Sequence, residues 1–222
     1  MTEEHQLVYD SIIESGYRDK NAVFIFQMNG GFKKRYKATT LFDKVSDLEK
    51  EALSYLRKGN SVLDVGAGAG RISLFLLKNG FCVSALEKSK TICRVLKKRG
   101  VKKIINTDIF KYSPKIKYDV VLLINDYSIL GKTKGNIIKL FRLFRKKVLK
   151  SNGEIIFVSG LIGSKITRTI KRRFIFKDRV GLWFESSCLS MEDIIKIAKK
   201  SGLTTKEFKK DKTGEFFTIF KK

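Results

Sequence analysis

Apolar and polar residues follow a repeating order along most of the chain, in which short apolar runs alternate with segments of helical periodicity. The apolar runs predict strands and lie at residues 62–65, 82–86, 103–106, 118–125 and 154–158. The segments with apolar positions every three or four residues predict helices and lie at residues 71–78, 89–100 and 135–150. The run at 118–125 is apolar almost without a break, which is typical of a strand covered on both faces. This order predicts an α/β fold with a doubly wound, mostly parallel sheet.

The N-terminal part departs from this order. Residues 1–16 have the apolar spacing of an amphipathic helix, and residues 22–26 have that of a strand. A further helix is predicted over residues 46–57, with Ser46 as its N-cap and Glu49 completing a capping box.

The C-terminal part departs from it as well. A helix is predicted over residues 190–200, followed by strands at 203–208 and 215–220. The connection between these two strands is short, so we expect them to be antiparallel.

We expect a single domain over residues 46–222, preceded by an N-terminal helix and cap segment over residues 1–45, because no repeat or low-complexity linker interrupts the chain. The segment from about 161 to 189 matches no regular element, and we predict an irregular insertion there. This insertion is basic, with Arg168, Lys171, Arg172, Arg173, Lys177 and Arg179.

Composition narrows the range of functions. The 222 residues contain no apolar run near the ~20 residues of a membrane span and no secretory signal pattern. The three cysteines, at positions 82, 93 and 188, form no Cys-x-x-Cys pair, so neither a disulfide framework nor a zinc site is predicted. The single histidine, His5, argues against a Ser-His-Asp triad or a His-rich metal centre. We therefore expect a cytoplasmic protein with reduced thiols and no metal.

A glycine-rich loop follows the strand at 62–65. The sequence VLDVGAGAG places glycine at positions 66, 68 and 70, directly before a predicted helix. Glycine lets the backbone approach a ligand, and the helix N-terminus offers unpaired N–H groups to it. The spacing differs from the dinucleotide fingerprint G-x-G-x-x-G, whose third glycine would fall on Arg71 or Ser73. The loop therefore predicts a ligand site that is not an NAD site.

Acidic residues end three successive strands, as Asp64, Glu87 and Asp108. Glu87 lies 19 residues after Gly68, which is the separation at which an acid binds ribose hydroxyls in nucleotide folds. Each acid taken alone is also explained as a helix cap. Their common position favours one ligand crevice at the carboxyl ends of the strands.

With these motifs in order, the segment from Val62 to Val158 resembles the class I S-adenosylmethionine-dependent methyltransferases. The predicted terminal helix and hairpin suit the reversed last strand of that family's seven-stranded sheet. The resemblance implies S-adenosyl-L-methionine as the cofactor and methyl transfer as the reaction.

The resemblance also implies a role for each motif residue, beginning with the methionine part of the cofactor. Asp64 would bind its amino group, directly or through water. The loop residues would pack against the methionine part, and they are Gly66, Ala67, Gly68 and Gly70.

On the nucleoside side, the resemblance implies that Glu87 holds both ribose hydroxyls and that Lys88 flanks the adenine. Asp108 would accept from the adenine amino group, with the Ile109 N–H nearby. Asn125, where the strand at 118–125 ends, would face the methyl group and the acceptor.

The residues after Asn125 are the candidates for catalysis. Methylases of exocyclic amino groups on DNA bases carry an Asn/Asp-Pro-Pro-aromatic run at this place, but here both prolines are missing. Alignment alone can supply much of the acceleration, because the sulfonium methyl is already activated. Where the acceptor requires a base, Asp126 is the nearest candidate, with Tyr127 orienting it.

The charge of the chain bears on the acceptor. Lys and Arg number 47 against 22 Asp and Glu, a net charge of +25, and residues 131–180 alone carry +13. This concentration indicates either an anion-facing surface, such as one for an RNA backbone, or the solvated basic face of the helix at 135–150.

Three functions stay open at this point. We expect a methyltransferase acting on a small molecule, which can be anionic, in a pocket roofed by the N-terminal helix and residues 161–189. One alternative is an RNA methyltransferase that uses the basic 131–180 surface. The other is a non-catalytic scaffold that binds S-adenosylmethionine.

Overall fold

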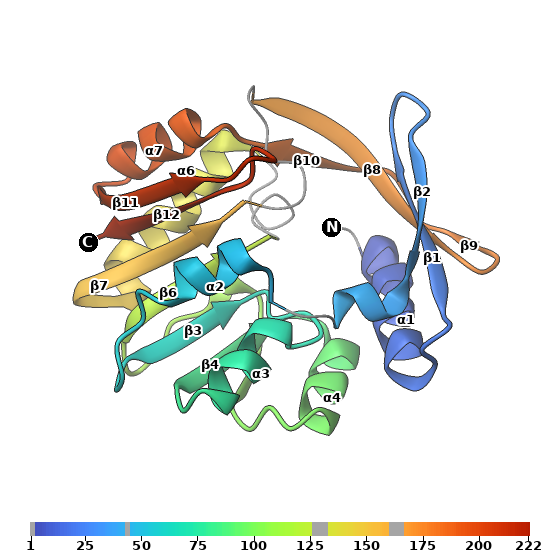
Figure 1. Ribbon diagram of the computed structural model, residues 1–222, viewed down its shortest axis with the longest axis horizontal. Helices are drawn as coiled ribbons and strands as arrows, with labels where there is room; N and C mark the ends of the chain where they lie inside the picture. The colour runs from blue at the N-terminus through green and yellow to red at the C-terminus, as the bar shows by residue number, and fades with distance from the viewer. Residues whose placement is uncertain (1–2, 43–44, 126–132, 160–166) are drawn as a thin grey trace.

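Seven strands form a mixed sheet at the centre of the main part of the molecule (Figure 1). The computed structural model describes residues 3–42, 45–125, 133–159 and 167–222. The strands of this sheet are β3 (Ser61–Val65), β4 (Cys82–Glu87), β5 (Ile104–Asn106), β6 (Tyr118–Ile124), β7 (Leu149–Val158), β11 (Thr204–Lys210) and β12 (Phe216–Lys221). Their order is β11-β12-β7-β6-β3-β4-β5. Strands β3 to β7 are parallel, whereas β12 is antiparallel to β7 and β11 is antiparallel to β12. The predicted doubly wound sheet with a reversed last strand is confirmed.

Helices cover both faces of this sheet. One face carries α2 (Asp47–Leu53), α3 (Arg71–Lys78) and α4 (Lys90–Lys98), and the other carries α6 (Lys134–Leu143) and α7 (Met191–Lys200). Successive residues of β6 alternate between the two cores: Val120 and Leu122 pack with α2 and α3, whereas Val121 and Leu123 pack with α6 and α7. Burial on both faces explains the unbroken apolar run of this strand.

Two predicted helices end earlier than their patterns suggest. Helix α2 stops at Leu53, although its pattern predicts a helix to residue 57. Helix α6 stops at Leu143, and a π-helical turn η3 (Phe144–Val148) leads directly into β7. Phe144 and Val148 are both fully buried, so the apolar stripe continues through the turn and resembles a longer helix.

A second, antiparallel sheet joins segments that are far apart in the sequence. Its strands are β1 (Val23–Met28), β2 (Lys33–Lys37), β8 (Arg168–Phe176), β9 (Arg179–Val180) and β10 (Phe184–Cys188). They lie in the order β10-β8-β1-β2, with β9 paired to β8. Helix α1 (Glu3–Arg18) packs against this sheet through Val8 and Ile12. We call α1 and this sheet the cap (Figure 1).

The cap corrects the prediction of an irregular insertion at 161–189, because residues 168–188 supply three strands. Strands β2 and β8 carry basic residues on both faces, so the apolar alternation that signals a strand is missing from them. The remaining short elements are the 3-10 turns η1 (Ala38–Leu41) and η2 (Ile109–Lys111). None of the described helices is long and apolar enough to cross a membrane.

Candidate active site

The glycine loop lies at the carboxyl end of β3, between β3 and α3. Gly66, Gly68 and Gly70 all have positive φ angles, of 72°, 52° and 83°. The N–H groups of Gly66 and Ala67 donate to the carbonyl of Leu86, at 2.9 and 3.1 Å, which fixes the loop against the end of β4. A Cβ atom on Gly70 would lie 2.5 Å from Leu96 Cδ2, so this position requires glycine for packing as well as for conformation.

Two of the predicted carboxylates are buried on either side of this loop. Asp64 is 4% exposed, and its Oδ2 accepts a 2.6 Å hydrogen bond from the Ser73 hydroxyl. Glu87 is 7% exposed; its Oε2 accepts from the Gly68 N–H at 3.2 Å and its Oε1 accepts from the Ser89 N–H at 3.0 Å. The fold thus brings Asp64, the glycine loop and Glu87 together.

The third acid follows β5, the next strand outward in the sheet. Asp108 begins η2 and accepts from the Phe110 N–H at 2.8 Å, so it is a helix cap as well as a ligand candidate. The Asn106 amide ties this region to β4 by donating to the carbonyls of Glu87 and Lys88, at 3.0 and 2.9 Å. Ile109 is buried, whereas the Lys88 side chain is exposed.

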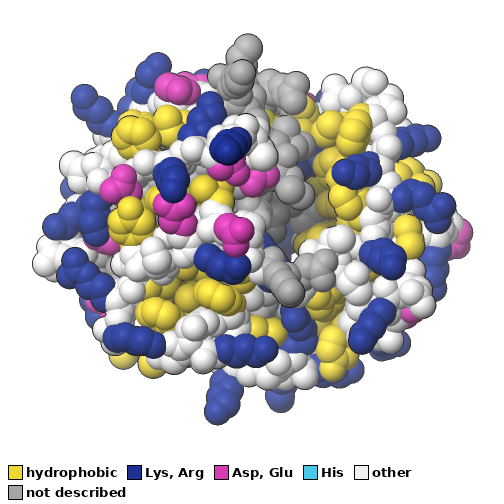
Figure 2. All heavy atoms as spheres, viewed as in Figure 1, with side chains coloured by type: hydrophobic (Ala, Val, Ile, Leu, Met, Phe, Trp, Pro, Cys, Tyr) yellow, Lys and Arg dark blue, Asp and Glu magenta, His cyan; other side chains and the backbone are white. Residues whose placement is uncertain are grey.

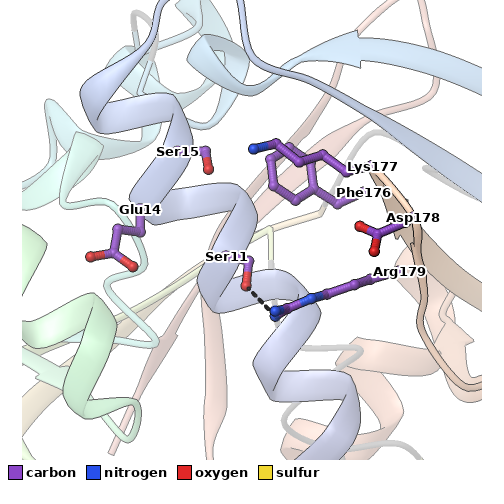
Figure 3. A pocket seen from close by; sticks show the side chains of 7 residues that line it. All are labelled: Ser11, Glu14, Ser15, Phe176, Lys177, Asp178 and Arg179. Carbon is purple, nitrogen blue, oxygen red and sulfur yellow. Dashed lines mark hydrogen bonds between the residues drawn. The ribbon is translucent and has the colours of Figure 1, made fainter.

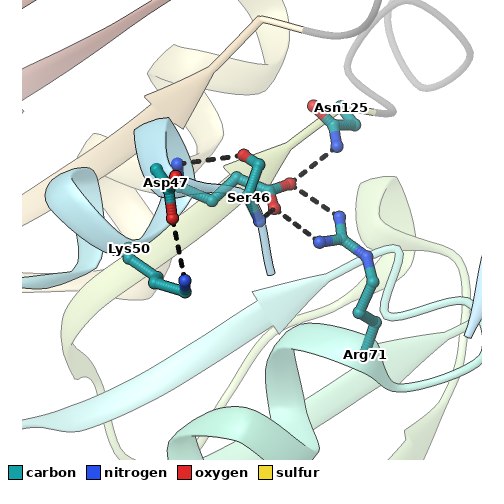
Figure 4. A network of polar contacts seen from close by, with 6 residues as sticks. Ser46, Asp47, Lys50, Arg71 and Asn125 are labelled. Atoms are coloured by element: carbon teal, nitrogen blue, oxygen red, sulfur yellow. Dashed lines mark hydrogen bonds and ion pairs between the residues drawn. The ribbon is translucent and has the colours of Figure 1, made fainter. Parts of the chain in front are cut away.

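Asn125 directly follows β6 and has a left-handed conformation, with φ of 67°. Its Nδ2 donates to Glu49 Oε1 at 2.8 Å (Figure 4). Glu49 belongs to the predicted capping box, which is confirmed by reciprocal hydrogen bonds with Ser46. Arg71, the first residue of α3, also donates to Glu49 through Nη1 and Nη2 of its guanidinium group. The candidate catalytic residues Asp126 and Tyr127 lie outside the described residues.

Helix α1 lies over the glycine loop. Ile13 packs with Ala69 of the loop and with Ile92 of α4. The Ser89 hydroxyl donates to Asp10 Oδ2 at 2.7 Å, which joins α1 to the start of α4. The Tyr9 hydroxyl lies 3.9 Å from the point where a Cβ of Gly68 would be. The N-terminal helix is therefore part of the walls of the site.

The inner face of the cap continues from Tyr9 as a row of aromatic rings. The ring of Tyr9 is 5.3 Å from that of Phe174, which is 5.8 Å from Phe26 and 5.7 Å from Phe184. The guanidinium of Arg172, which is half-buried, lies 5.5 Å from the Phe184 ring and 6.0 Å from the Phe26 ring. Figure 2 shows a hollow between the main part and the cap, with hydrophobic side chains on its cap side.

A separate shallow pocket of about 250 Å³ lies between α1 and the turn that joins β8 to β9 (Figure 3). Its lining residues are Ser11, Glu14, Ser15, Phe176, Lys177, Asp178 and Arg179. None of the predicted site residues lines it, so it is distinct from the crevice at the strand ends.

The basic residues of 131–180 that the structure describes lie in separate places. Lys150 lies at the amino end of β7, on the edge of the sheet opposite the glycine loop, where it pairs with Asp119 at 2.9 Å. Lys171 and Arg173 lie instead on the cap, and Arg173 stacks on Trp183 at 4.6 Å on the face opposite Arg172. Basic residues that are close together in the sequence therefore lie in different parts of the folded protein.

We call the carboxyl ends of β3, β4 and β6, together with the loop from Gly66 to Gly70, the glycine edge of the sheet. The residues at this glycine edge fit S-adenosylmethionine. A Cβ atom at Gly68 would lie 3.9 Å from both the Gly66 carbonyl oxygen and the Tyr9 hydroxyl, which is ordinary van der Waals contact, so the loop has room for a methyl-sized group there. Two buried carboxylates flank that room, and carboxylates suit an ammonium group and a pair of hydroxyls. Among the described residues, no group of three or more His, Cys, Asp or Glu side chains is arranged to hold a metal ion.

Sequence reasoning missed several residues of the site. In the sequence, Arg71 stands out only as the residue that breaks the dinucleotide fingerprint, and Glu49 only as a helix cap. Tyr9 and Asp10 have no local signal beyond the helical pattern of residues 1–16. All four contact residues that are far away in the sequence, and a local sequence pattern does not encode such contacts.

Comparisons with known proteins agree with this geometry. The family model described as "Tellurite resistance protein TehB" matches residues 24–180. A search of curated protein sequences found no match.

Among solved structures, a methyltransferase from Bacteroides fragilis, crystallised with S-adenosyl-L-homocysteine, is similar at 23% identity. It has a TM-score of 0.84 and covers 99% of this chain and 96% of its own, so the likeness includes the cap. The PH0226 protein from Pyrococcus horikoshii OT3 matches at 20% identity and a TM-score of 0.63, over 82% of this chain and 95% of its own. The glycopeptide N-methyltransferase MtfA, complexed with S-adenosyl-L-methionine, matches at 15% identity and a TM-score of 0.61, over 81% and 93%.

At these identities the solved structures establish the fold, and the family match covers well over half of the chain. The chain belongs to the TehB family of class I S-adenosylmethionine-dependent methyltransferases, and it is an enzyme with S-adenosylmethionine as its cofactor.

Proposed function

We propose that the enzyme transfers a methyl group to a small anionic acceptor held between the glycine edge of the sheet and the inner face of the cap. The observation that carries this proposal is Arg172, which lies within the aromatic row on that inner face. The row begins at Tyr9, beside the glycine loop, so it leads from the cofactor region to a positive charge.

On the cofactor side, Asp64 binds the methionine amino group and the loop from Gly66 to Gly70 packs against the methionine part. Glu87 holds the ribose hydroxyls, oriented by the backbone N–H groups of Gly68 and Ser89. Lys88, Asp108 and Ile109 border the adenine, which the position of η2 beside the end of β4 supports. Asn125 lies at the methyl end. The cofactor supplies an electrophilic methyl group on a positively charged sulfur.

On the acceptor side, Arg172 binds the anion. A planar guanidinium forms paired hydrogen bonds with oxyanions and carboxylates. The neighbouring rings of Phe26 and Phe184 limit its movement and lower the local dielectric, which strengthens its attraction for an anion. In the transfer, a lone pair of the acceptor forms the bond to the methyl carbon while the electron pair of the broken C–S bond stays on sulfur. An anionic acceptor needs no base for this step.

The cap also favours a small acceptor over a macromolecule. Because β1 pairs with β8, two segments that are far apart in the sequence form one unit beside the strand ends. Helix α1 packs against this unit and also contacts the glycine loop and α4, through Ile13 and through the hydrogen bond between Ser89 and Asp10. The family description names tellurite, a small oxyanion, and this makes tellurite the first acceptor to test.

The test measures transfer of labelled methyl from S-adenosylmethionine to tellurite and to a panel of small carboxylates and thiolates. We expect Arg172→Ala to raise the KM of the acceptor by about 10-fold or more, since it removes a charge-assisted contact, with cofactor affinity unchanged. Arg173→Ala is the matched control, because this neighbour lies on the opposite face of the same strand. Equal KM values for the two variants would refute the role of Arg172.

A further inference from the structure

Glu49 accepts hydrogen bonds from Ser46, Arg71 and Asn125 in a buried polar network, and these three partners are labelled in Figure 4. Glu49 is 3% exposed, and its carboxylate accepts four hydrogen bonds. Oε2 accepts from the Ser46 N–H at 2.7 Å and from Arg71 Nη1 at 2.5 Å. Oε1 accepts from Arg71 Nη2 at 2.6 Å and from Asn125 Nδ2 at 2.8 Å. A carboxylate has about four lone-pair sites, so this one is filled.

The network joins three segments that meet only in the folded protein. Ser46 and Glu49 start α2, Arg71 starts α3 directly after the glycine loop, and Asn125 follows β6. A buried carboxylate is stable only when such donors surround it. Burial alone would raise the pKa of Glu49, but the hydrogen bonds and charge of Arg71 outweigh burial and hold the pKa below its ordinary value. Glu49 is thus an anion at neutral pH.

Asn125 is fixed both at its backbone and at its side chain. Its N–H donates to the Val158 carbonyl at 3.1 Å, and its φ of 67° is a conformation that few residues other than glycine adopt. Because Nδ2 donates to Glu49, the amide cannot rotate by half a turn without placing its oxygen against a carboxylate. The orientation of the amide is therefore set by Glu49, and its oxygen lies on the side away from Glu49 (Figure 4).

We propose that Glu49 is a positioning residue for methyl transfer, which holds the Asn125 amide so that its oxygen, rather than its NH2 group, faces the sulfonium end of the cofactor. This inference rests on the proposed function in placing Asn125 at the methyl end. An amide oxygen carries partial negative charge and stabilises the positive sulfonium and the methyl hydrogens next to it. A rotated amide would present hydrogens to a cation instead.

The test compares Glu49→Gln and Asn125→Gly, singly and together, in the labelled-methyl assay. A glutamine side chain has one acceptor oxygen in place of two, so Glu49→Gln cannot hold both Arg71 and Asn125 as the carboxylate does. Asn125→Gly tolerates the positive φ and removes the side chain with its amide. We expect each single variant to lower kcat by about 10-fold to 100-fold, with the dissociation constant for S-adenosylhomocysteine within about twofold of wild type.

The double variant separates positioning from a general structural role. Two residues that act through one contact are not additive, so we expect the double variant to lose no more activity than the worse single variant. Asp47→Asn is the matched control. Asp47 lies on the same turn of α2 as Glu49, but it is exposed and, among the described residues, pairs with Lys50 alone. The kcat of this variant should therefore equal that of wild type.

Two results would overturn the inference: a wild-type kcat in Asn125→Gly, or activity losses that multiply in the double variant. Asn125→Gly keeps the test valid even if Glu49→Gln fails to fold. All variants are compared on tellurite and, in parallel, on whichever cell-extract fraction the wild-type enzyme labels. A wrong acceptor therefore refutes the proposed function while the ratios between variants still test Glu49.

Discussion

At the residue scale, three buried carboxylates define the glycine edge of the sheet: Asp64, Glu87 and Glu49. Each accepts hydrogen bonds that fix its direction, from Ser73, from the N–H groups of Gly68 and Ser89, and from the Arg71 network, respectively. Buried carboxylates carry a large desolvation cost unless such donors compensate it. These three carboxylates are therefore built into the site, unlike the exposed acidic residues of the surface.

Glu87→Gln tests the cofactor side of this arrangement. The substitution keeps the volume but replaces one acceptor oxygen by a donor, which faces the backbone N–H of Gly68 or Ser89. We expect the dissociation constant for S-adenosylmethionine, measured by calorimetry, to rise by about 10-fold or more, corresponding to roughly 1.4 kcal/mol. Glu185→Gln, on an exposed position of β10, should leave it unchanged. Unaltered affinity in Glu87→Gln would argue against its ribose role.

The cysteines provide a second prediction at this scale. Burial, followed by the nearby charge of Glu87, raises the pKa of Cys93 to about 11. Its thiolate fraction at pH 7 is consequently very small, and the thiolate is the nucleophile. Mass spectrometry after brief treatment with iodoacetamide at pH 7 should find the exposed Cys82 modified first, and modification of Cys93 should accelerate as the pH approaches 11. Equal rates at pH 7 would contradict this assignment.

At the element scale, α1 closes one side of the site through contacts with the glycine loop and α4. The Asp10–Ser89 hydrogen bond joins α1 to the start of α4, and Ile13 packs on Ala69 of the glycine loop. We expect a helix held in this way to open and close together with cofactor exchange, because its contacts lie on the loop that binds the cofactor.

Asp10→Ala should therefore loosen α1 and speed cofactor release. Loss of a hydrogen bond to a charged group costs about 1.5–3 kcal/mol, so we expect faster hydrogen exchange in α1 and a several-fold higher off-rate for S-adenosylhomocysteine. Glu14→Ala on the same helix removes only its exposed pair with Arg18, worth about 0–1 kcal/mol, and should change neither quantity. Identical exchange in both variants would show that Asp10 does not hold the helix.

The elements also show what the sequence can predict. The strands from β3 to β7, the glycine loop and the capping box of α2 follow from local patterns, because each pattern is the direct result of local burial or capping. The cap does not follow, since β1 and β8 pair across more than a hundred residues and β2 is almost entirely charged. For the same reason the link between Glu49 and Asn125 has no sequence signature.

At the scale of the whole molecule, the net charge of +25 is spread over separate places. One group of basic residues lies near the amino end of β7, far from the glycine edge, as the pairing of Lys150 with Asp119 shows. Another lies on the outer face of the cap. An RNA substrate would need a continuous basic path into the site. Among the described residues, the Arg172 guanidinium lies between the aromatic rings of Phe26 and Phe184 on the inner face of the cap.

The most direct test of methyl transfer to a small acceptor is a labelling experiment on a cell extract. Purified enzyme and methyl-labelled S-adenosylmethionine are added, the extract is divided into small-molecule, protein and RNA fractions, and Glu87→Ala serves as the inactive control. We expect the label to enter the small-molecule fraction and Glu87→Ala to abolish this labelling. Label in the RNA fraction that is removed by nuclease, with none in small molecules, would contradict it.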